Sequence, residues 1–169
     1  TEFNITPFNF IDTYLQINDI VGKKSLFEAE MFRSKEIIKN LAITNEKSSF
    51  SFIVLDEIFS STNYIEGYAG AYAILKKISN NKKCISITTT HYTQLSNLEK
   101  DTNGLIKNYK FDVIINDNNI IFNYLLKRGV SHQYIALNLL KINGFDDDII
   151  DDSMKIVTHL TQPHNNPRE

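Results

Sequence analysis

Two adjacent carboxylates follow a short apolar run near the middle of the chain. The run Phe50–Leu55 is rich in β-branched and aromatic residues, which predicts a buried strand, and Asp56 and Glu57 come directly after it. Carboxylates held at the carboxyl edge of a parallel sheet can serve a metal ion and a water molecule together. The pattern predicts that Asp56 orients Mg²⁺ and that Glu57 polarises an attacking water. The alternative is a strand that simply ends in solvated acidic residues.

A histidine stands at the equivalent point of the next predicted strand. This strand starts in the apolar run Cys84–Ile87 and continues through three threonines to His91. An imidazole at this edge could contact the γ-phosphate of a nucleotide, although an exposed loop histidine is the alternative. A strand that ends in Asp-Glu, the Walker B arrangement, followed by a strand-end histidine is typical of an ABC-type ATPase.

The sheet edge that would hold these residues is predicted by alternating strand and helix patterns. A partly alternating segment over 8–17 predicts a strand, and Ser25-x-x-Glu28 has the form of a capping box that starts a helix over 25–42. A second helix is predicted over 65–79. The order favours an α/β fold with a mostly parallel sheet. The apolar positions at helical spacing are Phe27, Met31, Ile38 and Leu41 in the first helix and Tyr68, Tyr72, Leu75 and Ile78 in the second.

The second half of the sequence predicts a hairpin and two helices. The polar run Asn116–Asn119 is a turn signal between two apolar runs, and Asn143-Gly144 is typical of a left-handed helix end. The segment after Pro163 has too little apolar content to pack and is predicted to be loose. The predicted elements are strands over 111–115 and 120–125 and helices over 131–142 and 146–160.

Composition limits the classes of protein that this sequence can encode. A length of 169 residues suits one domain, and a net charge of −2 without a basic stripe argues against direct binding of nucleic-acid phosphates. The single cysteine, Cys84, excludes an internal disulfide and a zinc cluster, and we expect it to be an inert core residue. The sequence shows no membrane-length apolar run and no signal-peptide pattern, so we expect a soluble, intracellular protein.

Four segments, in the right order, resemble motifs of the MutS family of DNA mismatch-recognition proteins. The block Asp56–Gly67 resembles the family's Asp-Glu-Ile-Gly-Arg-Gly-Thr-Ser-Thr-x-Asp-Gly at the same length, and Thr90–Leu95 resembles Thr-His-(Tyr/Phe)-x-x-Leu. The resemblance extends from about Phe10 to Leu160. The other two segments are carried by Asp19, Gly22, Ser25, Phe27, Glu30 and Met31 upstream and by Gly129, Val130, Ser131 and Tyr134 downstream.

The resemblance implies a fold and a division of the chain. The fold is a partial ABC-type P-loop NTPase domain, in which helices flank a central, mostly parallel sheet and a C-terminal helix-turn-helix follows. Residues 1–128 would form the distal part of the ATPase domain, 129–160 a helical dimerisation element, and 161–169 a loose tail. The last helix carries an apolar stripe that would be a dimerisation surface or, alternatively, a core-facing one. The stripe consists of Ile149, Ile150, Met154, Val157 and Leu160.

Members of the family work as dimers that share two nucleotide sites across their interface, which implies roles for the matching residues. Asp56 would hold Mg²⁺ through water, and Glu57 and His91 would act on the chain's own ATP. Ser25 would contact the partner's ATP at a helix N-terminus, where N–H groups favour a phosphate, although simple helix capping is the alternative. Thr62 would lie at the dimer seam and link the sites, or be an ordinary turn residue.

Two features separate this sequence from the usual family pattern. Phe59-Ser60-Ser61 stands where Gly-Arg-Gly is usual and Ile135 where Gly is usual, which resembles divergent MutS-like proteins of large DNA viruses and some organelles. The sequence also holds no Gly-x-x-x-x-Gly-Lys-(Ser/Thr) loop, whose backbone N–H groups cradle phosphates. We therefore expect a fragment that lacks the phosphate-binding loop and the mismatch-reading regions and has little ATPase activity by itself.

The predicted function is a part in an ATP-dependent sensor of DNA mismatches or damage, with ATP and Mg²⁺ as ligands. Its partners would be a MutS-family subunit, identical or different, and mismatched double-stranded DNA bound through regions outside this chain. We expect no membrane partner and an intracellular location; the sequence leaves the compartment open, with a nucleus, an organelle and a viral factory as the alternatives. The rival hypotheses are a non-catalytic dimerisation or recruitment module and a chromosome-maintenance ATPase head, whose Leu-Ser-Gly-Gly signature is missing from 41–49.

Overall fold

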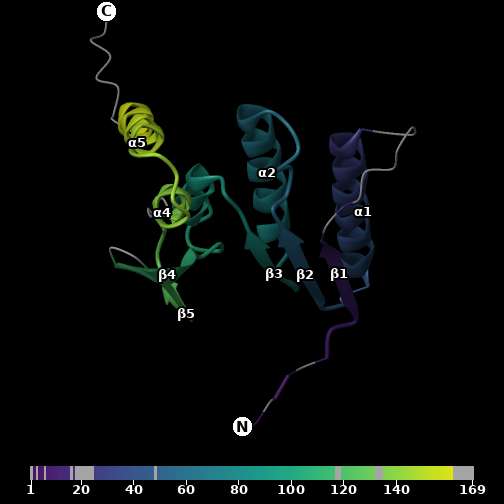
Figure 1. The fold of residues 1–169 in the computed structure, drawn as a ribbon. Coiled ribbons are helices and arrows are strands. Elements are labelled where there is room, and N and C mark those ends of the chain that lie inside the picture. The colour runs from purple at the N-terminus through teal and green to yellow at the C-terminus, as the bar shows by residue number, and fades with distance from the viewer. Residues whose placement is uncertain are drawn as a thin grey trace, which may run out of the picture. The chain divides into compact units, whose positions relative to one another are not determined.

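The computed structural model forms two compact units, unit 1 over Thr1–Asn108 and unit 2 over Tyr109–Glu169 (Figure 1). The boundary predicted between residues 128 and 129 divides segments of the MutS-family resemblance, whereas the boundary between residues 108 and 109 divides compact units of the structure. The compact units do not test the earlier boundary, which stays a prediction. The structure describes all residues except 1, 3, 6, 16, 18–24, 48, 117–118, 132–134 and 162–169.

Unit 1 is built on a three-stranded parallel sheet with the strand order β1-β2-β3. The strands are β1 (Phe10–Tyr14), β2 (Ser51–Asp56) and β3 (Cys84–Thr89), and the crossovers carry α1 (Leu26–Glu46) and α2 (Tyr64–Ser79). Parallel strands in sequential order joined by right-handed crossovers place both helices on the same face of the sheet, and Figure 1 shows α1 and α2 side by side. The α/β fold with a parallel sheet is confirmed.

The core of unit 1 lies between the sheet and these two helices. Ile53 and Leu55 of β2 are 0% and 1% exposed, and they pack in one cluster with Ile37 of α1 and Ile78 of α2. Alternate residues of a strand point to the same face, so this pattern identifies the face that the helices cover. Burial of these side chains is the main source of stability for the unit.

The opposite face of the sheet is apolar and open. Ile11, Phe52 and Ile85 are in-register neighbours across the three strands. Ile11, Ile85 and Ile87 are 64%, 58% and 55% exposed, whereas all-parallel sheets are generally covered on both faces. The ring of Phe8 stacks on that of Phe52, with 5.2 Å between the ring centroids. Among the described residues of unit 1, no helix covers this face.

Helix α1 begins where the sequence predicts, and three of its four predicted apolar positions, Phe27, Ile38 and Leu41, pack in the core. Ser25 is its N-cap, and its Oγ accepts a hydrogen bond from the backbone N–H of Glu28. The predicted apolar face is partly wrong, because Met31 is 45% exposed while Glu30 and Ser34 are buried. The buried side of α1 therefore holds two polar groups: the Ser34 hydroxyl donates to the Glu30 carbonyl within the helix, and the Glu30 carboxylate accepts from Ser61 in the loop after β2.

Two further short helices follow β3 and were not predicted from the sequence. They are the 3₁₀ helix η1 (Thr93–Asn97) and α3 (Leu98–Asp101), and Leu95 and Leu98 anchor them in the core. Cys84 lies half-buried at the start of β3, and burial raises the pKa of its thiol to about 11. A thiol with a raised pKa is a poor nucleophile, in line with the inert role expected for this residue.

Unit 2 contains the predicted hairpin and helix pair. Strands β4 (Tyr109–Asn116) and β5 (Asn119–Arg128) are antiparallel, and helices α4 (Ile135–Ile142) and α5 (Asp147–Thr161) follow. Gly144 ends α4 with φ of 75°, as the Asn143-Gly144 pair predicts. The predicted motif residue Tyr134, like Asp19 and Gly22, and the tail over 162–169 lie outside the described residues. Within the described chain, no helix has the length and apolar character needed to cross a membrane.

Candidate active site

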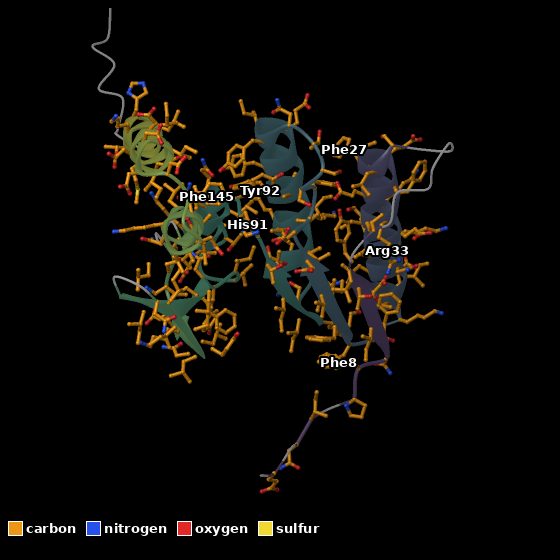
Figure 2. All side chains as sticks on the ribbon, viewed as in Figure 1. Phe8, Phe27, Arg33, His91, Tyr92 and Phe145 are labelled. Atoms are coloured by element: carbon orange, nitrogen blue, oxygen red, sulfur yellow. The ribbon has the colours of Figure 1, made fainter. Side chains whose placement is uncertain are left out.

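The two predicted carboxylates lie at the carboxyl edge of the parallel sheet. Asp56 is the last residue of β2 and is the register partner of Thr89, the last residue of β3. Glu57 follows with a left-handed backbone, φ of 51°. His91 lies just beyond β3, in the region where Figure 2 labels it beside Tyr92. The strand register therefore brings residues more than thirty positions apart in the sequence to one edge.

Thr89 joins the two carboxylate residues and was missed by the sequence analysis. Its hydroxyl donates a hydrogen bond to Oδ1 of Asp56. The backbone N–H of Glu57 donates to the Oγ1 and the carbonyl oxygen of Thr89, at 3.2 and 3.1 Å. The only sequence signal was the run of threonines before His91, which did not indicate which of them faces β2.

Glu57 and His91 form a direct pair. Oε1 of Glu57 lies 2.9 Å from Nε2 of His91, and their side chains are 45% and 86% exposed. Both groups are therefore accessible to a ligand from solvent. A carboxylate next to an imidazole can hold and polarise a water molecule, since the two side chains offer an acceptor and a titratable nitrogen.

Asp56 offers an oxygen ligand of the kind that Mg²⁺ prefers. Mg²⁺ prefers oxygen ligands and is usually held by one or two carboxylates, phosphate oxygens and waters. Asp56 is exposed and supplies such an oxygen. In the described part of the chain, no group of three metal-ligating side chains could form a complete protein cage.

The loop after Glu57 is fixed by the contacts of its buried residue Phe59. Phe59 has φ of 60° and is 5% exposed, although this left-handed backbone is usual for glycine. The Phe59 N–H donates to the hydroxyl of Tyr14 at 3.3 Å, and the hydroxyl of Tyr92 donates to the Phe59 carbonyl at 2.6 Å. The ring lies against Gly70, where an added Cβ would be 2.9 Å from it. These contacts offset the cost of the unusual φ.

In the described part of the chain, the hydrogen bonds and the ion pair of the edge group, which consists of Asp56, Glu57, Thr89 and His91, do not include the other two predicted site residues. Ser25 is exposed at the N-terminus of α1, and Thr62 is half-buried in the loop before α2. Among the described residues, the hydrogen bonds and ion pairs that link Asp56, Glu57 and His91 do not reach Ser25 or Thr62. The structure therefore brings three of the five predicted residues together.

The family model described as MutS domain V matches residues 1–161 of this chain. The chain belongs to the MutS family. The DNA mismatch repair protein MutS of Clostridium perfringens is 32% identical over 145 residues, which are 85% of this chain and 15% of that protein. The protein of the same name from Clostridium botulinum is 30% identical over the same shares.

The family membership predicted from four motifs is thus confirmed. This chain spans about 15% of the length of the MutS relatives that it matches. The matched region contains the Asp-Glu strand end and the following histidine, so the MutS-family chain carries the edge group within the shared segment. The other 85% or so of those relatives' length has no counterpart in this match.

Proposed function

We propose that this MutS-family chain is the hydrolysis part of an ATP-dependent DNA mismatch sensor. The observation that supports the proposal is the edge group, in which Asp56 and Glu57 are both tied to Thr89 and Glu57 reaches His91. Asp56 would hold Mg²⁺ through a water molecule, and the Mg²⁺ ion would neutralise charge on the phosphates. Glu57 would orient the attacking water, and His91 would contact the γ-phosphate.

Catalysis at this edge would rest on positioning and electrostatics. A water oxygen attacks the γ-phosphorus of ATP, the bond to the bridging oxygen breaks, and ADP and phosphate leave. With Oε1 of Glu57 and Nε2 of His91 paired, the other carboxylate oxygen, Oε2, accepts a hydrogen bond from the water and aligns its lone pair, and the other ring nitrogen, Nδ1, donates to a γ-phosphate oxygen. Donors and acceptors that are already in place lower the barrier because they need no reorganisation during the reaction.

A dimer would complete each site. Ser25 lies at the N-terminus of a long helix, where exposed N–H groups and the helix dipole favour an anion, so it is suited to the γ-phosphate of the partner's ATP. Thr62, in the loop after Glu57, would lie at the seam between the subunits. The terminal helix pair would dimerise through α5, whose stripe exposes Ile149, Met154 and Leu160.

The phosphate-binding loop would come from a segment outside this chain. The open face of the sheet supports this proposal, because Ile11, Ile85 and Ile87 need a second layer to remove them from water. Phe8 already packs on Phe52 at this face. Mismatched double-stranded DNA would likewise be bound by regions outside this chain, as its net charge of −2 agrees poorly with a phosphate-binding surface.

The test is Mg²⁺-dependent ATP turnover in two proteins. One is this chain alone, and the other is a chimera in which it replaces the matching 145 residues of the Clostridium perfringens MutS protein. We expect almost no turnover by the chain alone and clear turnover by the chimera. Glu57→Gln in the chimera should lower kcat about 100-fold or more, while Glu46→Gln, an exposed carboxylate at the end of α1, should leave it unchanged.

Two results would contradict this proposal. One is turnover by the isolated chain that survives Glu57→Gln. The other is a chimera that binds a fluorescent ATP analogue and hydrolyses ATP equally well with and without the Glu57→Gln substitution. The binding measurement separates a chimera that has failed to fold from a site that has been assigned wrongly.

A second candidate function is a non-catalytic dimerisation module. The exposed stripe of α5 favours it, because Met154 and Leu160 are 42% and 72% exposed. Sedimentation at increasing concentration and without nucleotide distinguishes the two functions. Dimerisation that Met154→Asp abolishes, in a chimera without ATP turnover, would favour the module over the ATPase.

A further inference from the structure

A buried carboxylate connects helix α1 to the loop that follows Glu57. Glu30 lies in the second turn of α1 and is 4% exposed. The hydroxyl of Ser61 donates to its Oε2 at 2.6 Å. The hydroxyl of Tyr14 also interacts with this carboxylate: burial is the largest cause that raises the pKa of Tyr14, the Phe59 N–H lowers it, and Glu30 raises it further. We call these three residues, Glu30, Ser61 and Tyr14, the Glu30 network.

The Glu30 network holds the loop at two points. Ser61 is fixed through its side chain, and Phe59 is fixed through its backbone N–H, which donates to the Tyr14 hydroxyl at 3.3 Å. The Phe59 ring adds an edge contact to Phe27 in the first turn of α1, with 5.6 Å between the ring centroids. The first turns of α1 and the loop over 57–61 are therefore joined by polar and apolar contacts at once.

The polar character of this connection needs a reason beyond stability. A buried carboxylate costs desolvation free energy, and an apolar side chain of similar size would fill the space at lower cost. Hydrogen bonds to a carboxylate are directional and stronger than neutral ones, so they fix a geometry that apolar packing leaves looser. Ser61 supplies the hydroxyl that completes the network.

We propose that Glu30 is a positioning residue whose network makes the α1 N-terminus and the loop over 57–61 move as one body. The inference rests on the proposed function, in which Ser25 contacts the partner's nucleotide and Glu57 orients water at the chain's own site. Ser25 precedes Glu30 by little more than one helical turn, and Glu57 precedes Ser61 by four residues. A displacement at one nucleotide site is thereby transmitted to the hydrolytic carboxylate of the other.

The test uses the full chain without nucleotide and follows the loop by NMR. Two readouts report its position, the hydrogen exchange of the Phe59 amide and the ring signals of His91, for which Glu57→Gln gives the reference of a broken pair. Ser61→Ala and Glu30→Gln should speed the exchange about tenfold or more and move the His91 signals towards that reference. Glu36→Gln, on the exposed side of the same helix, is the matched control and should change neither.

Coupling is tested with a second change at the helix N-terminus. Ser25→Ala removes the N-cap and should shift the amide signals of the loop over 57–61 in the otherwise unchanged chain. In a Ser61→Ala background the same change should no longer reach the loop. A residue that only stabilised the fold would lower the melting temperature without breaking this dependence.

The proposal is overturned if folded Ser61→Ala keeps the exchange rate and the His91 signals of the unchanged chain, or if Ser25→Ala still reaches the loop in that background. Glu30→Gln can fail to fold, which circular dichroism detects. Ser61→Ala then decides alone, since it removes one hydroxyl from an exposed residue. Because no nucleotide is present, an inactive chimera would contradict the proposed function and leave this result standing.

Discussion

Units 1 and 2 differ in how much apolar surface each buries. Unit 1 has a continuous core that draws on all three strands and both long helices. In unit 2, Val113 and Ile150 are the buried hydrophobic residues among those that the structure describes. Many of its other large apolar side chains are more than one third exposed, among them Phe111, Tyr124, Leu125, Leu126, Ile149 and Leu160.

The difference suits the two units to different roles, unit 1 as a scaffold that holds the edge group and unit 2 as an exposed apolar surface. The edge group needs side chains held within a few tenths of an ångström, and unit 1 supplies rigid strand ends backed by a packed core. Unit 2 exposes apolar side chains on its hairpin and on its last helix, which is typical of a surface that another part of an assembly covers. The difference explains why the candidate chemistry gathers in unit 1 and the candidate dimerisation surface in unit 2.

The largest effect should come from truncating one isoleucine in each unit. Ile53→Ala removes a side chain that is 0% exposed, and the free energy of unfolding should fall by about 3 kcal/mol. Ile121→Ala, on the hairpin, removes one that is 44% exposed, and the loss should stay under about 1 kcal/mol. Urea unfolding followed by circular dichroism measures both. Equal losses would contradict the view that unit 1 has the better-packed core.

A smaller effect should come from adding one methyl group at a glycine of each unit. In Gly67→Ala the new Cβ would lie 2.1 Å from the Tyr92 hydroxyl and 2.6 Å from the Phe59 carbonyl, so overpacking should cost about 2 kcal/mol. In Gly144→Ala nothing lies within 4 Å and only the φ of 75° is strained, so about 1 kcal/mol is expected. Thermal unfolding gives the order, and Gly67→Ala should also speed exchange at Phe59. A larger loss for Gly144→Ala would contradict the view that packing governs unit 1.

The smallest effect should come from acid and should act on the hairpin of unit 2. Hydrogen bonds from Lys127 and then Lys110 hold the pKa of Asp112 below its ordinary value of 3.8. The folded carboxylate therefore stabilises the hairpin above that value, and the contribution is lost as pH falls through the lower folded pKa. Asp112→Asn should flatten the pH dependence of the hairpin amide signals below about pH 4 and change little at pH 7. The same substitution at Asp151, on α5, is the control.

The order and type of most elements follow from the sequence because their signals are local. Alternation and β-branched runs predicted the strands, and the Ser25 capping box predicted where α1 begins. The buried face of α1 was predicted only in part, because Leu41 is buried as expected whereas Met31 is exposed and Glu30 is buried. Glu30 and Met31 are adjacent, and the polar one is buried because Tyr14 and Ser61 supply its partners. Periodicity reads apolar character and carries no information about hydrogen-bond partners that are distant in the sequence.

The sequence by itself identified the residues of the candidate site. Asp56 and Glu57 directly follow one apolar run, and His91 comes after the three threonines that follow another. Only the tertiary structure decided how they meet. The register of β2 against β3 places Thr89 beside Asp56 and sets the distance of 2.9 Å between Glu57 and His91. The same holds for the left-handed φ of Phe59, which tyrosine hydroxyls from two other segments hold in place. Contacts between residues thirty or more positions apart depend on strand pairing and packing, which no local pattern of residues specifies.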